Sequence, residues 1–191
     1  MRNIFVIDNY DSFTYNLVHI LREMGFGESN MRIVRNDQFE LDEVEDFDNV
    51  LLSPGPGIPR DAGLMPKTIE RYAPTKNILG VCLGHQSIGE VFGSDLFNLP
   101  QVYHGMVTPV NVIKKDELFN DIPTTFNACR YHSWVIDKSS LSDQLEITSI
   151  AENGNIMSVK HKEYKVRGVQ FHPESIMTEH GKLLMKNWLA L

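Results

Sequence analysis

The sequence predicts an α/β fold in which an open, mainly parallel sheet is flanked by helices, with a smaller antiparallel sheet in the second half. Two observations predict this fold. Short apolar runs alternate with helix-like segments up to about residue 92, an order typical of parallel sheets. From residue 107 onward, strand-like segments follow one another with only turns between them, which favours antiparallel pairing. The sequence has no repeats or linker-like stretches, so we predict a single domain over residues 1–191.

The first half of the chain contains the elements of the predicted parallel sheet. Residues 4–7 form a short, β-branched apolar run that is typical of a buried strand. The next segment predicts a helix that Ser12 caps and Gly25 ends, because its apolar residues recur at helical spacing: Tyr15, Leu17, Val18, Leu21 and Met24. Further strands are predicted at residues 31–34, 49–52 and 78–81, and further helices at residues 64–72 and 86–92.

The second half predicts short strands and a terminal helix. The strands cover residues 107–113, 125–129, 145–150, 157–159 and 166–171, and the helix covers about residues 179–189. In open parallel sheets, sites form at the carboxyl ends of the strands. Asp8, Ser53 and Cys82 all stand at such ends, so we expect a site there.

Composition limits the function classes. The chain has 191 residues, 42% of them hydrophobic and 23% charged, which suits one domain with a sizeable core. Its net charge of −7 argues against nucleic acid as the main partner. Apolar runs stay far below the roughly 20 residues that span a bilayer, and residues 1–8 predict a strand ending at an acid rather than a signal peptide. Two cysteines make no disulfide framework, so we expect a reducing cytoplasm.

The segment Gly80-Val-Cys82-Leu-Gly84 predicts a nucleophile elbow. A short apolar run ends there and a helix-like segment follows at once, which is the strand–turn–helix arrangement that presents a reactive side chain. Glycines two residues before and after Cys82 keep side chains out of the turn. A helix N-terminus favours the thiolate, the form that attacks. By itself the motif is equally compatible with a buried structural cysteine.

The segment Phe171-His172-Pro173-Glu174 supplies a base and a group to orient it. His172 follows a predicted strand, and residues i and i+2 of an extended chain point the same way, so His172 and Glu174 should project to one side. Pro173 stiffens the pair. A carboxylate on one imidazole nitrogen leaves the other to face a thiol, as in a Cys–His–acid triad. The alternative is a capping histidine beside a solvated glutamate.

An oxyanion hole is predicted beside the thiol. The backbone N–H of Leu83 follows the nucleophile directly and is the default donor. The loop Ser53-Pro-Gly-Pro-Gly57 follows a neighbouring strand, and its glycines offer further N–H groups, although a purely structural turn would have the same composition. A phosphate cradle is disfavoured, because no Lys-Ser/Thr pair follows the glycines.

These three motifs, Ser53-Pro-Gly-Pro-Gly57, Gly80-Val-Cys-Leu-Gly-His-Gln86 and Phe171-His-Pro-Glu-Ser175, resemble those of the class I (triad) glutamine amidotransferases. The opening Asp8-Asn-Tyr-Asp-Ser-Phe-Thr-Tyr-Asn16 resembles the subgroup that serves anthranilate synthase and aminodeoxychorismate synthase. The short length resembles a free-standing amidotransferase subunit rather than a fusion.

The resemblance implies roles for particular residues. Cys82 would attack the side-chain amide of L-glutamine, His172 would protonate the departing ammonia, and Glu174 would orient His172. The resemblance places the oxyanion hole at the N–H groups of Gly55 and Leu83. It places the substrate-binding residues at Gly55, Pro56, Gly57, Gln86, Ser133 and Trp134.

The resemblance also implies a partner. Ammonia would pass to a chorismate-binding synthase large subunit, which would hold magnesium, while this chain would need no cofactor or metal of its own. We expect the large subunit of anthranilate synthase, and the alternative is that of aminodeoxychorismate synthase. Trp134 stands where relatives more often have Leu, and Met106 where they commonly have Lys. Neither departure removes a catalytic group.

Other interpretations of the same residues stay open. The polar residues of the helix predicted after Ser12 could simply cap and pack it, whereas the resemblance suggests a place near the subunit interface or the ammonia exit. His85, His104 and His132 lack metal-ligand spacing, and Cys129 is predicted to be a buried, inert thiol. Competing function classes are a regulatory module that has lost activity and a stand-alone γ-glutamyl hydrolase.

Overall fold

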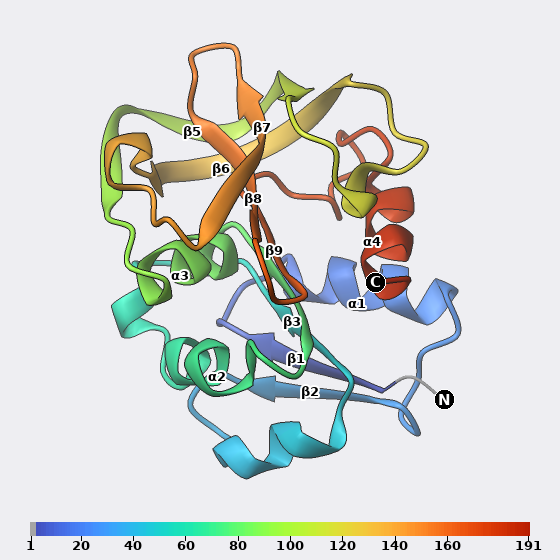
Figure 1. Cartoon of the computed structure of the whole chain (residues 1–191). Helices are drawn as coiled ribbons and strands as arrows, with labels where there is room; N and C mark the ends of the chain where they lie inside the picture. Colours follow the sequence, from blue (N-terminus) through green and yellow to red (C-terminus); the bar gives the residue numbers. More distant parts are fainter. Residues whose placement is uncertain (1–2) are drawn as a thin grey trace.

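Nine strands form one continuous mixed sheet in the computed structural model, which describes residues 3–191 (Figure 1). Five neighbouring strands run parallel in the order β2 (Met31–Arg35), β1 (Ile4–Asp8), β3 (Asn49–Leu52), β4 (Asn77–Val81) and β9 (Val166–Val169). The antiparallel strands continue from β9 in the order β8 (Ile156–His161), β7 (Leu145–Ala151), β5 (Leu96–Val112) and β6 (Thr125–Ile136). The predicted α/β class is confirmed, and the antiparallel part extends the parallel sheet through the β8–β9 pair.

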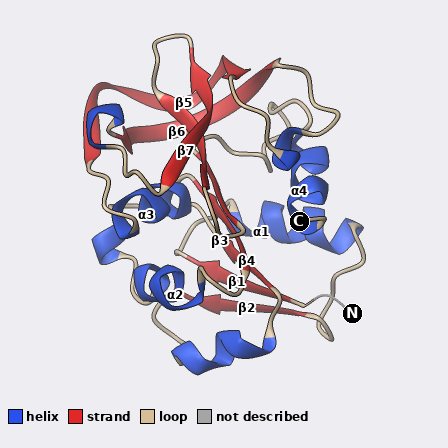
Figure 2. Ribbon diagram, in the orientation of Figure 1, coloured by secondary structure: helices blue, strands red, loops and turns tan. Residues whose placement is uncertain are grey.

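Helices cover both faces of the parallel strands, as Figure 2 shows. On one face, α1 (Thr14–Glu23) and α4 (Gly181–Leu189) pack their apolar side chains against alternate residues of the strands, such as Val6 and Leu79. On the other face, α2 (Met65–Tyr72) and α3 (Leu83–Val91) pack against the intervening residues, such as Phe5 and Ile78. This two-sided burial explains why the parallel strands read as continuous apolar runs. Short 3-10 helices occupy Leu41–Asp46, Pro59–Asp61, Glu117–Phe119 and Lys138–Ser140.

The start of the first helix differs from the prediction. The cap position is held by Phe13, without a side-chain cap, so the prediction that Ser12 caps this helix is wrong. The carboxylate of Asp8, at the end of β1, instead accepts hydrogen bonds from the Asp11 N–H at 3.2 Å and the Thr14 hydroxyl at 3.0 Å. The Asp8 carboxylate at the end of β1 therefore stabilises the start of α1.

Other boundaries differ mainly in the antiparallel part. Strand β5 begins at Leu96, well before the predicted strand of residues 107–113. Strand β6 ends at Ile136, well beyond the predicted strand of residues 125–129. Two irregularities interrupt the β5–β6 register, and Gly105 adopts φ +68° at one of them. They break the alternation of side chains between the two faces, so the part of β5 before residue 107 has no clear strand pattern in the sequence. The helix at the elbow begins at Leu83 rather than at residue 86, and the terminal helix begins at Gly181 rather than at residue 179.

The turn after β4 has the backbone of a nucleophile elbow. Cys82 adopts φ 52° and ψ −97°, a conformation that side-chain-bearing residues rarely adopt. A Cβ on Gly80 would lie 2.5 Å from the carbonyl group of Gly84, and a Cβ on Gly84 would lie 2.6 Å from the carbonyl oxygen of Leu52. Both glycines are therefore required by close backbone approach.

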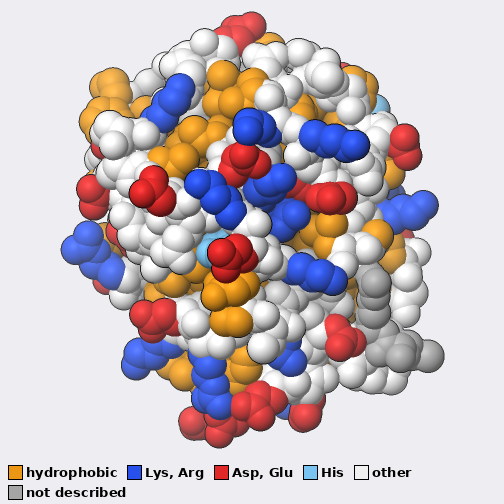
Figure 3. Space-filling view, viewed as in Figure 1, with side chains coloured by type: hydrophobic (Ala, Val, Ile, Leu, Met, Phe, Trp, Pro, Cys, Tyr) orange, Lys and Arg blue, Asp and Glu red, His pale blue; other side chains and the backbone are white. Residues whose placement is uncertain are grey.

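The surface carries mixed charges. Figure 3 shows acidic and basic side chains interspersed over the face that it presents. Within the described residues, no helix has the length and apolar character needed to cross a membrane.

We expect Gly84→Ala to lower the free energy of unfolding by about 1–3 kcal/mol, because its Cβ would press on the backbone of β3 at Leu52. Urea denaturation measures this change, with Gly27→Ala as the matched control, since a Cβ on Gly27 meets nothing within 4 Å. Equal stability of the two variants would show that the elbow tolerates a side chain at residue 84.

Candidate active site

Three adjacent strands deliver the predicted site residues to one edge of the sheet. Strand β4 lies between β3 and β9, so the residues that follow these strands meet at their carboxyl ends. The Cys82 N–H donates to the Val169 carbonyl of β9 at 2.8 Å. The His172 N–H donates to the Cys129 carbonyl of β6 at 3.0 Å, which ties the segment after β9 to the antiparallel part.

The imidazole of His172 is buried and paired with a buried carboxylate. Its Nδ1 lies 2.6 Å from Oε1 of Glu174, and its Nε2 has no hydrogen-bond partner among the described residues. The rings of Phe13 and Tyr131 contact His172 edge-to-face, with centroids 5.5 and 5.2 Å away. Burial lowers the pKa of His172, but the neighbouring Cys82 and Glu174 outweigh it and raise this pKa to about 10. The imidazolium form is therefore favoured.

The thiol of Cys82 stands at the N-terminus of α3, where unpaired N–H groups favour negative charge. Its Sγ lies 3.8 Å from the carbonyl oxygen of Tyr131 and accepts from Nε2 of Gln170 at 3.6 Å. Only 5% of the Cys82 residue is exposed. The arrangement can present a thiolate beside an imidazolium, which is the starting pair for acyl transfer.

The glycine loop after β3 packs directly on the first turn of α3. A Cβ on Gly55 would lie 2.7 Å from Cδ2 of Leu83 and 2.6 Å from Cβ of Asn9. Asn9 holds this loop, because its N–H donates to Oγ of Ser53 at 2.9 Å and its side-chain amide donates to the Ser53 carbonyl at 2.8 Å. The two residues predicted to form the oxyanion hole are therefore neighbours.

A cavity of about 220 Å³ opens at Cys82. Its lining includes the predicted residues Gly55, Gly57, Gln86, Ser133 and Trp134. Pro56 is exposed and lies outside this lining. The side-chain amide of Gln86 donates to the Trp134 carbonyl at 2.9 Å, so the main chain at Trp134 faces α3.

Sequence reasoning missed several residues around this cavity. Val102, Tyr103, His104, Tyr131 and His132 line it, and they come from the paired strands β5 and β6. The β5–β6 register that brings them there is irregular and has no local sequence signal. Gln170, whose side-chain amide donates to Sγ of Cys82, carried such a signal, because it stands two residues before His172 in the predicted strand of residues 166–171.

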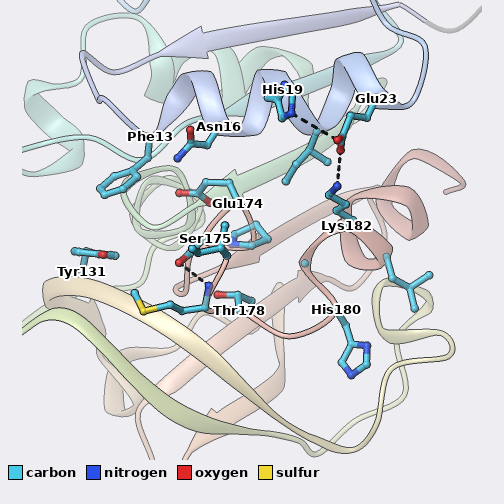
Figure 4. A pocket seen from close by; sticks show the side chains of 16 residues that line it. Phe13, Asn16, His19, Glu23, Tyr131, Glu174, Ser175, Thr178, His180 and Lys182 are labelled. Carbon is cyan, nitrogen blue, oxygen red and sulfur yellow. Dashed lines mark hydrogen bonds and ion pairs between the residues drawn. The ribbon is translucent and has the colours of Figure 1, made fainter.

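A second, larger cavity borders Glu174. This groove, of about 960 Å³, runs between α1 and the segment of residues 173–183 (Figure 4). Asn16 and Glu23 of α1 border it together with Phe13 at the helix cap, and Glu174 lies in its lining. Tyr131 lines both the groove and the smaller cavity. Among residues 3–191, no cluster of His, Cys, Asp or Glu could hold a metal ion.

Protonation of His172 makes stability fall as the pH rises. Its pKa rises from 6.5 to about 10 on folding, so between these values the folded state keeps a proton that the unfolded state loses. The stabilisation is complete below pH 6.5 and is lost as the pH rises through about 10. We expect the difference in unfolding free energy between wild type and His172→Gln to shrink over this range in denaturant titrations. A constant difference, or an imidazole pKa near 6.5 by NMR, would contradict this expectation.

Comparisons with known proteins agree with this geometry. The family model Glutamine amidotransferase class-I matches residues 5–191. Anthranilate synthase component 2 of Thermus thermophilus is 44% identical over 97% of this chain and 91% of the relative, and that of Pseudomonas aeruginosa is 42% identical over 97% and 94%. A crystal structure of a candidate GMP synthase component from Thermoplasma acidophilum superimposes with a TM-score of 0.88 at 26% identity, covering 100% of this chain and 93% of that one. The chain belongs to the class I glutamine amidotransferase family.

Proposed function

We propose that this chain is the glutamine-hydrolysing subunit of anthranilate synthase, supplying ammonia to a chorismate-binding large subunit. The observation that carries the proposal is the buried His172–Glu174 pair beside Cys82, which lines a small cavity. Relatives with the name anthranilate synthase component 2 match almost the whole chain at 41–44% identity, which supports the choice of partner.

The proposed first step is attack of the Cys82 thiolate on the amide carbon of glutamine. The carbonyl oxygen takes up negative charge, and we propose that the N–H groups of the neighbouring residues Gly55 and Leu83 stabilise it. Collapse of this intermediate breaks the C–N bond. The His172 imidazolium gives its proton to the leaving nitrogen, and ammonia departs from a γ-glutamyl thioester.

The proposed second step is hydrolysis of the thioester. Neutral His172 takes a proton from water, which attacks the thioester carbon and releases glutamate and the Cys82 thiolate. Glu174 keeps the ring in place throughout, because its Oε1 lies 2.6 Å from Nδ1 of His172. The Trp134 carbonyl faces Gln86, so we propose that glutamine meets the main chain here and that the large side chain of Trp134 is tolerated.

The groove between α1 and residues 173–183 is the proposed docking place for the large subunit. It lies beside the triad, and its rim carries exposed apolar side chains, including Ile176 at full exposure and Met177. Charged groups stand next to them, with Lys182 2.7 Å from Glu23 (Figure 4). Apolar residues rimmed by charges are typical of protein interfaces. A reducing cytoplasm is the proposed compartment, because Cys82 must remain a free thiol.

Replacing Cys82 with Ala should lower glutamine-dependent product formation by about 10³-fold or more, because no other thiol reaches the cavity. The assay contains this chain, the large subunit, chorismate, magnesium and glutamine. Ammonium salt in place of glutamine should restore full synthesis in the variant.

Cys129→Ala is the matched control, because Cys129 is fully buried and lies outside the cavity lining. Retained glutamine use by Cys82→Ala would overturn the catalytic assignment. Aminodeoxychorismate instead of anthranilate as the product would keep the chemistry and change the partner.

Ile176→Asp should weaken binding to the large subunit by about tenfold or more, because it places a charge on an apolar rim. Calorimetric titration measures the affinity. Ile113→Asp is the control, since Ile113 is also exposed but lies outside the groove lining. Unchanged binding by the Ile176 variant would place the partner on another surface.

A further inference from the structure

Arg130 is a buried cation without a carboxylate partner. It lies on β6 and is 1% exposed, and none of the ion pairs among the described residues includes it. One of its terminal nitrogens, Nη2, has no hydrogen-bond partner among those residues. Removing a charge from water without an opposite charge is unfavourable. A buried cation in this environment calls for a role beyond packing.

The contacts of Arg130 lead to the small cavity. Its guanidinium stacks over the ring of Tyr103 at 3.6 Å from the ring centroid, and its Nε–H donates to Nε2 of His132 at 3.1 Å. The rings of Tyr103 and His132 stack on each other, with centroids 5.3 Å apart. Both rings line the cavity at Cys82, so Arg130 stands directly behind two residues of its wall.

The guanidinium determines the protonation of His132. Arginine can only donate hydrogen bonds, so Nε2 of His132 must accept. The neutral ring then carries its proton on Nδ1, which lies 2.9 Å from the carbonyl oxygen of Trp134. Burial and the adjacent Arg130 lower the pKa of His132 to about 3, which keeps the ring neutral.

The chain of contacts ends on the segment that lines the cavity. The Trp134 carbonyl accepts from Nδ1–H of His132 and from the amide of Gln86, both at 2.9 Å, so residues 132–134 of β6 are held against α3. We propose that Arg130 is a positioning residue for glutamine binding, which holds His132 as the Nδ1–H tautomer and thereby fixes residues 132–134. This inference rests on the proposed glutamine site.

Arg130→Met tests the proposal, because it keeps a long side chain and removes the donors and the charge. In the complex with the large subunit, we expect the KM for glutamine to rise about tenfold or more, with kcat within about threefold of wild type. Ammonia-dependent synthesis should stay unchanged. The ¹⁵N spectrum of the His132 ring should lose the signature of the Nδ1–H tautomer. Arg130→Lys should restore part of the loss in KM, because it keeps a cationic donor.

Arg60→Met is the matched control, since Arg60 is exposed and lies outside the cavity lining. A folded Arg130→Met variant with wild-type KM and an unchanged His132 tautomer would overturn the proposal. So would a joint loss of kcat and ammonia-dependent synthesis, which indicates a general structural role. If Arg130→Met does not fold, a ¹⁵N spectrum of the wild type in which the His132 ring carries its proton on Nε2 overturns it equally, because Nε2 could not then accept from Arg130. Absence of glutamine hydrolysis by the wild-type complex would instead refute the proposed function, and the His132 spectra would still report on the contact with Arg130.

Discussion

The strained backbone at Cys82 is the constraint on which the site depends. A residue with a side chain holds φ 52° only where its surroundings leave no alternative. Here β4 is paired on both sides, and the Cys82 N–H is bound to Val169 of β9. Gly80 and Gly84 allow the two sides of the turn to approach each other. The same strand order that enforces the turn also delivers His172, because the chain leaves β9 beside the elbow.

The parallel half of the fold could be predicted from sequence because its signals are local. Buried strands such as Ile4–Asp8 and Asn77–Val81 are short apolar runs with clear ends, and the elbow follows from three closely spaced residues. The part of strand Leu96–Val112 before residue 107 could not be predicted, since register shifts and a left-handed Gly105 break the alternation that identifies a strand. The expected cap at Ser12 failed because a carboxylate at the end of the preceding strand provides the bonds instead.

The site was predictable where neighbours in sequence are neighbours in space. His172 and Glu174 are paired, although β9 ends at Val169 and the segment after it is held through a bond to β6. The remaining walls come from residues distant in sequence. Tyr131 contacts His172 only because the β5–β6 pair curls over the sheet edge, and sequence spacing does not encode that approach.

Glu174 connects the groove to the imidazole that lies beside Cys82. Its Oε1 holds His172, its Oε2 is buried without a partner among the described residues, and the residue lies in the lining of the groove. Tyr131 packs on the same imidazole and borders both cavities. Gly181 keeps residues 173–183 close to this centre, because a Cβ there would lie 1.9 Å from the Pro173 carbonyl oxygen. A group that docks in the groove therefore meets the residues that set the orientation and charge of His172, without entering the cavity at Cys82.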